Sequence, residues 1–508
     1  MPTDSEIWIR PSWMRKALSG VAVCATTVAL SACVGTPPAD EKTPQVVLPG
    51  AAPAGATSLN DRLFPYVGNT GYDAVNYELF YEYDPDTPVM RGRVVMAATA
   101  LEELSTFSLD SAVASVAKVL VNGNAAEYRS GGEKLVVALG DSVPAGTAFT
   151  VETHFTADRS KTPLSPLASP QDAEGLQPWV TWDNGFALFG QPDRSHVFFP
   201  MNDHPSDKAT VTTHVTTPDT LAVAANGTEI KRTKNQDGTA TTTFTTRDPI
   251  ATEVLQVAVG DLVRVQDEAD GVPLVSYIPA GSEKKFRDYL DLVPKHVKWM
   301  TEQVGPYYYE RYGILVLPRD YQGVALETAT MSTYGDLAGS SVADTDDVML
   351  HETAHQWFGD TVSPATWDDM WLSEGHASFY GMLYQLEQGH ADLDNTFRRA
   401  YEYDLENRAI TGPPTQLREA RDVLGSTNAP GVALLYALRA QVGTETFQEI
   451  ERTFLKNYAH KSATTADYVD TASRVTGQDL NHFFASWLAS ETTPEMPGRP
   501  DWSTPDNR

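Results

Sequence analysis

The sequence predicts a multidomain α+β protein, in which an all-β sandwich or saddle is followed by a mostly helical domain with a small sheet. Three observations lead to this fold class: a length of 508 residues, short runs of alternating polar and apolar residues up to residue 263, and long amphipathic segments after it. A chain of this length exceeds one ordinary hydrophobic core, so it favours more than one domain. We expect these two domains at residues 59–263 and 264–490.

The first domain is expected to consist of short strands. Its alternating runs include AVNYELFYEY, GRVVMAATAL and TAFTVETHF, and turn residues separate them. Asn122-Gly123 and Asn226-Gly227 are dipeptides typical of tight turns. Helical periodicity is almost absent here, which indicates a twisted sheet structure.

The second domain shows the longer period of helices. The segment KKFRDYLDLVPKHVKWMTEQVG at 284–305 is amphipathic, and YGILVLP at 312–318 is one of few strand-like runs. No internal repeat occurs at the periods of solenoids or propellers, so those architectures are not expected.

The N-terminal residues resemble a targeting segment. A positive group, Met14-Arg15-Lys16, precedes the apolar residues 17–30, which are too few to span a bilayer permanently. The segment ends in Leu30-Ser31-Ala32-Cys33, which resembles the lipobox of bacterial lipoproteins, in which the cysteine is lipidated. We expect a signal peptide with a lipobox at residues 1–33 and an extracytoplasmic protein.

Two alternatives stay open for this segment. An ordinary secretory signal would leave Cys33 incidental, and the true start is Met1 or Met14. If Cys33 is the first mature residue, it is the only remaining cysteine, so neither a disulfide nor a thiolate metal site is expected. Contact with a membrane is then expected only through a lipid anchor at Cys33.

Two further segments are expected outside the folded domains. Residues 34–58 are rich in Pro, Ala, Gly and Thr without an apolar period, which indicates a disordered tether. Residues 491–508 form a Pro-rich tail. The formal charge of −29, from 67 acidic and 38 basic residues, disfavours nucleic acid as a partner.

A metal-binding pattern lies in the second domain. His351 and His355 of HETAH are four residues apart, so on a helix both imidazoles lie on one face and can bind one cation. Glu352 is rotated away from that face, where its carboxylate can reach a metal-activated water as a general base. A second helical segment, residues 367–389, carries Glu374 near its start as the third ligand. Three protein ligands leave a coordination position open, which is typical of one catalytic zinc, Zn(2+), per chain.

Other candidate residues have weaker patterns. Asp369 is either a hydrogen-bond partner for a ligand imidazole or an acid at a helix start. Four histidines lack ligand spacing and are expected in the core, at the surface or beside the ligands: His196, His204, His376 and His390.

Two sequence blocks resemble the aminopeptidase N family of gluzincin zinc metallopeptidases. They are HETAHQWFGD at 351–360 and WLSEGHASF at 371–379. The block FPMNDHPSDKA at 199–209 resembles the end of that family's N-terminal sandwich, and the resemblance runs from about residue 60 to 490. It implies a thermolysin-like catalytic domain. Because NHFFASWL at 481–488 resembles the end of that domain, we expect a short form without the family's C-terminal helical domain.

The resemblance also implies how substrate is bound. The stretch Val324-Ala325-Leu326-Glu327-Thr328 resembles the family's exopeptidase motif, and Gln191 matches a glutamine that contacts the substrate amine. Glu327 would pair with the free α-amino group, and the strand through Ala325 would hydrogen-bond the peptide backbone. The expected partners are therefore peptide substrates with a free N-terminus, from which N-terminal residues are hydrolysed.

One feature departs from the family pattern. The family usually has a tyrosine that donates a hydrogen bond to the tetrahedral oxyanion, and alignment on Gly431 places Asn428 there. An asparagine amide is a shorter donor, and Tyr436 is about 12 Å further along by helical rise. Two alternatives to an aminopeptidase follow, a zinc endopeptidase and a catalytically weakened peptide-binding lipoprotein. The sequence does not indicate an oligomeric state.

Overall fold

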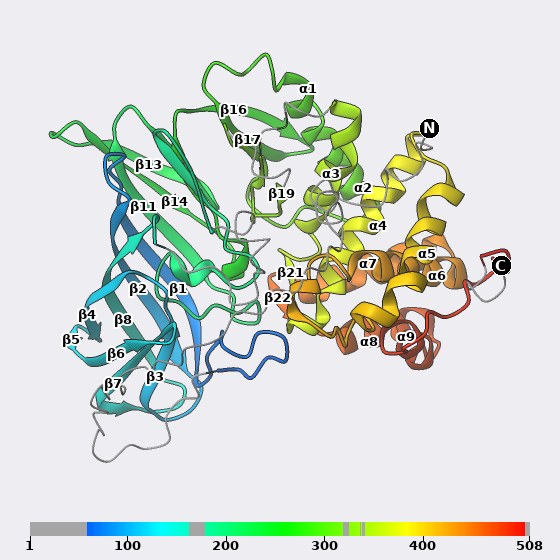
Figure 1. Cartoon of the computed structure of the whole chain (residues 1–508), viewed down its shortest axis with the longest axis horizontal. Helices are drawn as coiled ribbons and strands as arrows, with labels where there is room; N and C mark the ends of the chain where they lie inside the picture. The colour runs from blue at the N-terminus through cyan, green and yellow to red at the C-terminus, as the bar shows by residue number, and fades with distance from the viewer. Residues whose placement is uncertain (1–57, 162–177, 319–324, 336, 338–340, 503–508) are drawn as a thin grey trace, which may run out of the picture.

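We describe a computed structural model of the chain, in which residues 58–161, 178–318, 325–335, 337 and 341–502 are described. The expected signal peptide, the lipobox at Cys33 and the tether up to residue 57 lie outside the described residues. Figure 1 shows a β-rich half, coloured blue to green, beside a helical half, coloured yellow to red. The fold class expected from the sequence, an all-β domain followed by a mostly helical one, is confirmed.

The N-terminal half consists of strands with short 3-10 helices at Ser195–Val197 and Thr252–Val254. Its strands are β1 (Tyr72–Glu82), β2 (Val89–Ala100), β3 (Leu104–Asp110), β4 (Ser115–Val121), β5 (Asn124–Ala125), β6 (Glu127–Gly131), β7 (Lys134–Val143), β8 (Ala148–Asp158), β9 (Trp179–Trp182), β10 (Gly185–Leu188), β11 (Thr210–Pro218), β12 (Ala222–Ala225), β13 (Thr228–Lys234), β14 (Thr239–Thr245) and β15 (Val257–Gly260).

These strands form three sheets. An eight-stranded sheet has the order β13-β14-β11-β1-β2-β8-β4-β5, a four-stranded sheet the order β12-β15-β10-β9, and a three-stranded sheet the order β3-β7-β6. All pairings of β1, β2, β8 and β14 in the large sheet are antiparallel except that of β1 with β11.

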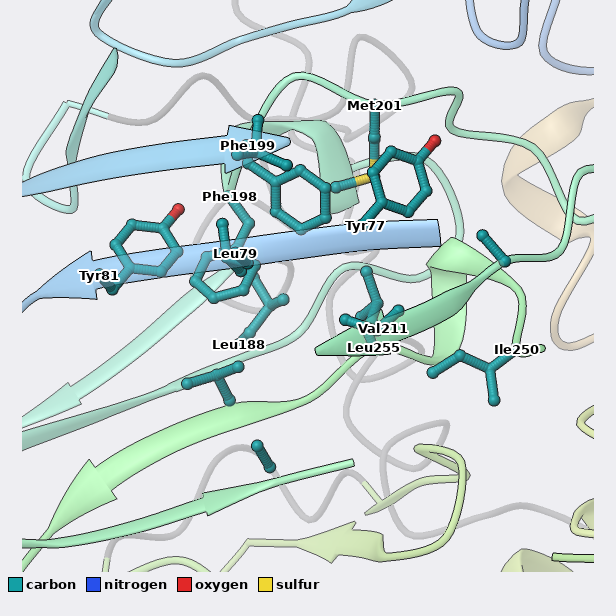
Figure 2. Close-up of a cluster of buried hydrophobic side chains, with 14 of the residues drawn as sticks. Tyr77, Leu79, Tyr81, Leu188, Phe198, Phe199, Met201, Val211, Ile250 and Leu255 are labelled. Atoms are coloured by element: carbon teal, nitrogen blue, oxygen red, sulfur yellow. The ribbon is translucent and has the colours of Figure 1, made fainter. Parts of the chain in front are cut away.

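The core of this half lies against the strand β1. Tyr77, Leu79 and Tyr81 alternate with more exposed residues along β1, so all three side chains point to the same buried face. Burying Leu79 alone contributes about 1.5–3 kcal/mol relative to leaving it exposed. The surrounding side chains labelled in Figure 2 are Leu188, Phe198, Phe199, Met201, Val211, Ile250 and Leu255.

A five-stranded sheet begins the C-terminal half. Its order is β16-β17-β18-β20-β19, and the change of sheet falls between Gly260 and Leu262. Two further strands pair in parallel beside the helices. The strands are β16 (Leu262–Ala269), β17 (Val272–Pro279), β18 (Ile314–Val316), β19 (Ala325–Leu326), β20 (Ser332–Tyr334), β21 (Val362–Pro364) and β22 (Lys461–Ala463).

The helices of the described part of the chain follow β17. They are α1 (Arg287–Leu290), α2 (Val293–Val304), α3 (Val342–His355), α4 (Trp371–Glu387), α5 (Leu393–Thr411), α6 (Asn428–Val442), α7 (Thr444–Tyr458), α8 (Thr465–Thr476) and α9 (Asn481–Leu488). Short 3-10 helices lie at Trp367–Asp369 and Ala420–Asp422. Among the described residues, we find no helix with the length and apolar character needed to cross a membrane.

The amphipathic segment at 284–305 differs in one detail from the single helix that its period suggests. It forms two helices, α1 and α2, separated at Asp291 and Leu292. Pro294 stands in the first turn of α2. Since proline has no N–H to donate, the helical hydrogen bonds are interrupted here, and proline is well tolerated in the first turn of a new helix.

Candidate metal centre and substrate site

The two motif histidines lie in the last turn of α3. Their spacing of four residues brings the Nε2 atoms of His351 and His355 to 3.0 Å from each other. Gly359 lets the chain turn away directly after the helix, with a φ of +122°. A Cβ at this position would lie 2.4 Å from the Ser373 hydroxyl and 3.2 Å from His355 Nδ1, so the close approach requires glycine.

Glu374 reaches the same point from the first turn of α4. Its Oε2 atom lies 3.5 Å from Nε2 of His351 and 3.9 Å from Nε2 of His355. The glutamate and His355 are buried, whereas 20% of the His351 side chain is exposed. The site is therefore open to solvent or substrate on the His351 side.

This donor set fits zinc. Two ligands at about 2.0–2.1 Å from a tetrahedral zinc lie about 3.3 Å from each other, and the three distances between His351, His355 and Glu374 bracket that value. Burial and the neighbouring His351 lower the pKa of His355 to about 3, which keeps this imidazole neutral. A neutral imidazole is the form that binds a metal.

Hydrogen bonds hold each imidazole in the required orientation. His355 Nδ1 donates to the carbonyl oxygen of Phe358 at 3.1 Å and lies 3.0 Å from the hydroxyl of Ser373. His351 Nδ1 lies 3.3 Å from the hydroxyl of Ser378. With Nδ1 protonated and bound in both rings, Nε2 keeps its lone pair for the metal.

The carboxyl group of Glu352 lies beside the metal centre, near His355 and Glu327. Donor atoms of Glu327, Glu352 and His355 all lie within 4.8 Å of one another. The Oε2 atom of Glu352 is buried and has no hydrogen-bond partner among the described residues. Burial raises the pKa of Glu352, and the carboxylates of Glu327, Glu374 and Asp360 raise it further. This carboxyl group is thus a stronger base than an exposed glutamate.

Glu327 forms a buried cluster with residues of the N-terminal half. Gln191 Nε2 donates to Glu327 Oε1 at 2.5 Å and lies 3.5 Å from Oε2 of Glu253. Burial raises the pKa of Glu327, and the hydrogen bond from Gln191 opposes that shift. Burial also raises the pKa of Glu253, with Glu327 as the next cause. Two carboxylates from different domains therefore share one amide.

The backbone around Glu327 is held on both sides. Gln356 Oε1 accepts a hydrogen bond from Thr330 N at 2.8 Å, which ties the loop to the end of α3. Asn226 Nδ2 donates to Ala329 O at 2.6 Å, which ties the loop to the N-terminal half. The strand β19, which contains Ala325, pairs only with β20 and ends the sheet order, so its other side is an open edge within the described part of the chain.

The structure thus brings together all of the residues named from the sequence for the metal, the base and the amine. It also corrects one alternative: Asp369 does not touch a ligand imidazole. The Asp369 carboxylate accepts from the backbone N and hydroxyl of Thr465 and from the hydroxyl of Thr366. It therefore links the start of α4 to the start of α8.

The histidines without ligand spacing lie outside the metal centre. His196 is buried against Asp203, His204 contacts Ser206, and His390 is exposed beside Gln385. His376 is buried between Phe358 and Glu451.

The amide of Asn428 is not available as a donor to an oxyanion, because it is bound to other groups. Its Nδ2 donates to Glu374 Oε2 at 2.9 Å and to Ser378 Oγ at 3.2 Å. Tyr436 stacks on Phe397 and Trp502, with ring centroids 4.8 and 5.5 Å away. Tyr436 is thus part of the helical core, as its distance along α6 suggests.

Sequence reasoning missed three contributors to the site: Glu253, Ser373 and Ser378. Ser373 and Ser378 flank Glu374 at −1 and +4, so helical spacing alone could have placed Ser378 on the face of the ligand. Nothing local to Glu253 indicates a role, because its contact with Gln191 crosses 62 residues of sequence.

Comparison with known proteins gives matches to both halves in chain order. Residues 73–254 match the Peptidase M1 N-terminal domain, and residues 289–487 match the Peptidase family M1 domain. A leucyl aminopeptidase from Saccharolobus solfataricus is 24% identical over 442 residues, which are 82% of this chain and 53% of the relative. An aminopeptidase N from Acetobacter pasteurianus is 31% identical over 36% of this chain and 54% of its own length. The chain spans about half the length of these curated relatives.

A solved structure is similar over nearly its full length. The M1 zinc metallopeptidase from Deinococcus radiodurans, in a mutant bound to a Tyr-Ser-Ala substrate, superposes with a TM-score of 0.74 at 28% identity. The match covers 87% of this chain and 99% of that chain. Since both domains match in order and two imidazoles and a glutamate converge where the motif requires them, this chain belongs to the M1 family of zinc metallopeptidases.

Proposed function

We propose that this protein is a zinc-dependent aminopeptidase, which hydrolyses N-terminal residues from peptides. The observation that carries the proposal is the buried carboxylate of Glu327. It lies beside the metal donors and Glu352, and Gln191 holds it in place.

The charges around Glu327 favour a cationic ligand. Burial raises the pKa values of the carboxyl groups of Glu253, Glu327 and Asp360, and the charge of Glu327 raises those of Glu253 and Asp360 further. Lys208 lies close to them, but its Nζ donates to the carbonyl oxygens of Asp360 and Thr361. A substrate ammonium beside Glu327 would supply positive charge where desolvated carboxylates lack it, which selects peptides with a free N-terminus.

The edge strand β19 suits the peptide backbone. Within the described part of the chain one side of β19 is unpaired, and Glu327 follows the strand directly, so an extended peptide adding to β19 would place its first residue at the carboxylate. The bond that follows the first residue then lies near the metal donors and Glu352.

Each catalytic group has one task in this arrangement. His351, His355 and Glu374 would hold zinc, and the chemistry that a bound zinc supplies is Lewis-acid activation of water and of the scissile carbonyl. Glu352 takes the proton of the attacking water on its carboxylate and passes it to the leaving amine. The aminopeptidase names of two relatives and the tripeptide bound to the Deinococcus radiodurans enzyme agree with this assignment.

The test compares substrates with free and blocked amines. We expect aminoacyl p-nitroanilides to be cleaved and their N-acetyl derivatives not to be. In Glu327→Ala the KM for free-amine substrates should rise at least tenfold, since a charge-assisted hydrogen bond is worth about 1.5–3 kcal/mol. The ratio of the cleavage rates of free-amine and N-acetylated substrates should become smaller in that variant. Equal cleavage of both substrates by the unmodified protein would instead point to an endopeptidase.

We further propose that the mature chain lies outside the cytoplasm, held to the membrane by a lipid on Cys33. The support is the sequence alone: a positive group, the apolar residues 17–30 and the lipobox-like Leu30-Ser31-Ala32-Cys33. In Cys33→Ser, the protein should carry no lipid. It should either keep its signal peptide uncleaved or appear in the soluble fraction. Metabolic labelling with a fatty-acid analogue measures the lipid directly. If label, mass and fractionation are the same in Cys33→Ser as in the unmodified protein, the lipid anchor is contradicted.

A further inference from the structure

A close helix crossing brings Asn428 to the metal centre. The helices α4 and α6 meet at Gly375 and Gly431, where a Cβ on Gly431 would lie 2.5 Å from the Cα of Gly375. Asn428 stands one helical turn before Gly431, and Glu374 and Ser378 flank Gly375 on the same side of α4. The contact of the two glycines therefore brings the short amide side chain within reach of a metal ligand.

Both hydrogen bonds donated by this amide end at the metal centre. Asn428 Nδ2 donates to Glu374 Oε2, the same oxygen that lies closest to the two imidazoles, and to the hydroxyl of Ser378. Ser378 Oγ in turn lies 3.3 Å from His351 Nδ1. One amide thus contacts Glu374 directly and His351 through one hydroxyl.

The orientation of the amide follows from these partners. Turning it over would place Oδ1 against the Glu374 carboxylate, where two acceptors repel. In the observed orientation Oδ1 is buried and has no hydrogen-bond partner within the described residues. The side of Asn428 that remains unused is thus an acceptor, which cannot donate to an oxyanion.

We propose that Asn428 is a positioning residue of the metal centre, which orients Glu374 directly and His351 through Ser378. This inference rests on the zinc site of the proposed function, although not on its substrate. It gives the position aligned with the family's oxyanion tyrosine a different task, because the two N–H groups of the amide are already bound. Loss of hydrogen bonds that orient metal ligands typically costs about 10–100-fold in metal affinity.

The test measures zinc affinity of the full chain by competition with a chromogenic chelator. Asn428→Ala should weaken zinc binding about 10–100-fold. Asn428→Asp should weaken it at least as much despite equal size, because an acceptor then faces Glu374 Oε2. Ser378→Ala should also weaken binding, and the double variant should lose less than the product of the two single losses, since both act on His351 through one contact.

A matched control is Asn407→Ala. Asn407 is a half-buried asparagine of α5 whose amide donates to Tyr403 O at 2.8 Å, so its loss should leave zinc affinity unchanged. Melting temperatures of the metal-free variants show whether each one folds. If Asn428→Ala does not fold, Ser378→Ala alone decides, and unchanged zinc affinity there would overturn the proposal.

Two other results would also overturn it. One is zinc affinity in Asn428→Ala within twofold of the unmodified protein. The other is Asn428→Tyr with unchanged zinc affinity and a kcat raised ten- to hundredfold, since this would show that the position serves the oxyanion. If the unmodified chain binds zinc through its three ligands but cleaves no peptide, the proposed function fails and the role of Asn428 stands. If it binds no zinc, both fail.

Discussion

Glu352→Gln is expected to lower kcat by about 10²–10⁴-fold, the usual contribution of a positioned general base. The substitution keeps the size and shape of the side chain but removes the group that accepts the proton. Zinc content should be unchanged, because the metal donors are His351, His355 and Glu374. Turnover of an aminoacyl p-nitroanilide and zinc content by atomic emission test the two statements on one sample.

The matched control for this prediction is Glu449→Gln, which makes the same change on the exposed face of α7. Its turnover should equal that of the unmodified protein. Loss of zinc in Glu352→Gln, or retention of more than a tenth of the turnover, would contradict the assignment of Glu352 as the base.

His351→Ala is expected to weaken zinc binding by more than about a hundredfold. Removing a hydrogen-bond partner of a ligand costs about 10–100-fold, and removing the ligand itself should cost more. Only two of the three donors then remain at a site that must hold the metal against solvent. Zinc content after dialysis against a weak chelator measures the loss, and turnover should fall with it.

His390→Ala serves as the comparison, because His390 is an exposed histidine of the same half of the chain whose ring contacts Gln385. Full zinc occupancy in His351→Ala would disprove the metal centre. Equal loss in both variants would show a general effect of the substitution on the fold.

Much of the fold could be read from local patterns. Alternation along β1 places Tyr77, Leu79 and Tyr81 on one face, and such alternation needs no knowledge of the partner strands. The break between α1 and α2 shows the limit of this reasoning. An amphipathic period continues through Pro294, whereas the helical hydrogen bonds are interrupted, because proline has no N–H to donate.

The substrate-binding residues Gln191 and Glu327 were predicted from the family resemblance and not from a local pattern. The pairing of Gln191 with Glu327 crosses 136 residues and that of Glu253 with Gln191 crosses 62. Such contacts depend on how the N-terminal half packs against the C-terminal half, which no local period describes. Asp369 illustrates the same limit, since its partner Thr465 is 96 residues away.

The sequence by itself determined the metal donors and the base. His351, Glu352 and His355 belong to the single motif HETAH on one helix, so the geometry of that helix directs the two rings to one point and leaves the carboxylate of Glu352 beside it. Only the tertiary structure decided what surrounds them. Asn428 and Glu374 are 54 residues apart, and the amide reaches the carboxylate because two glycines let α4 and α6 approach until their backbones touch. A hydrogen bond requires its two atoms within about 3 Å, a distance that the packing of separate helices sets and that neither helix specifies alone.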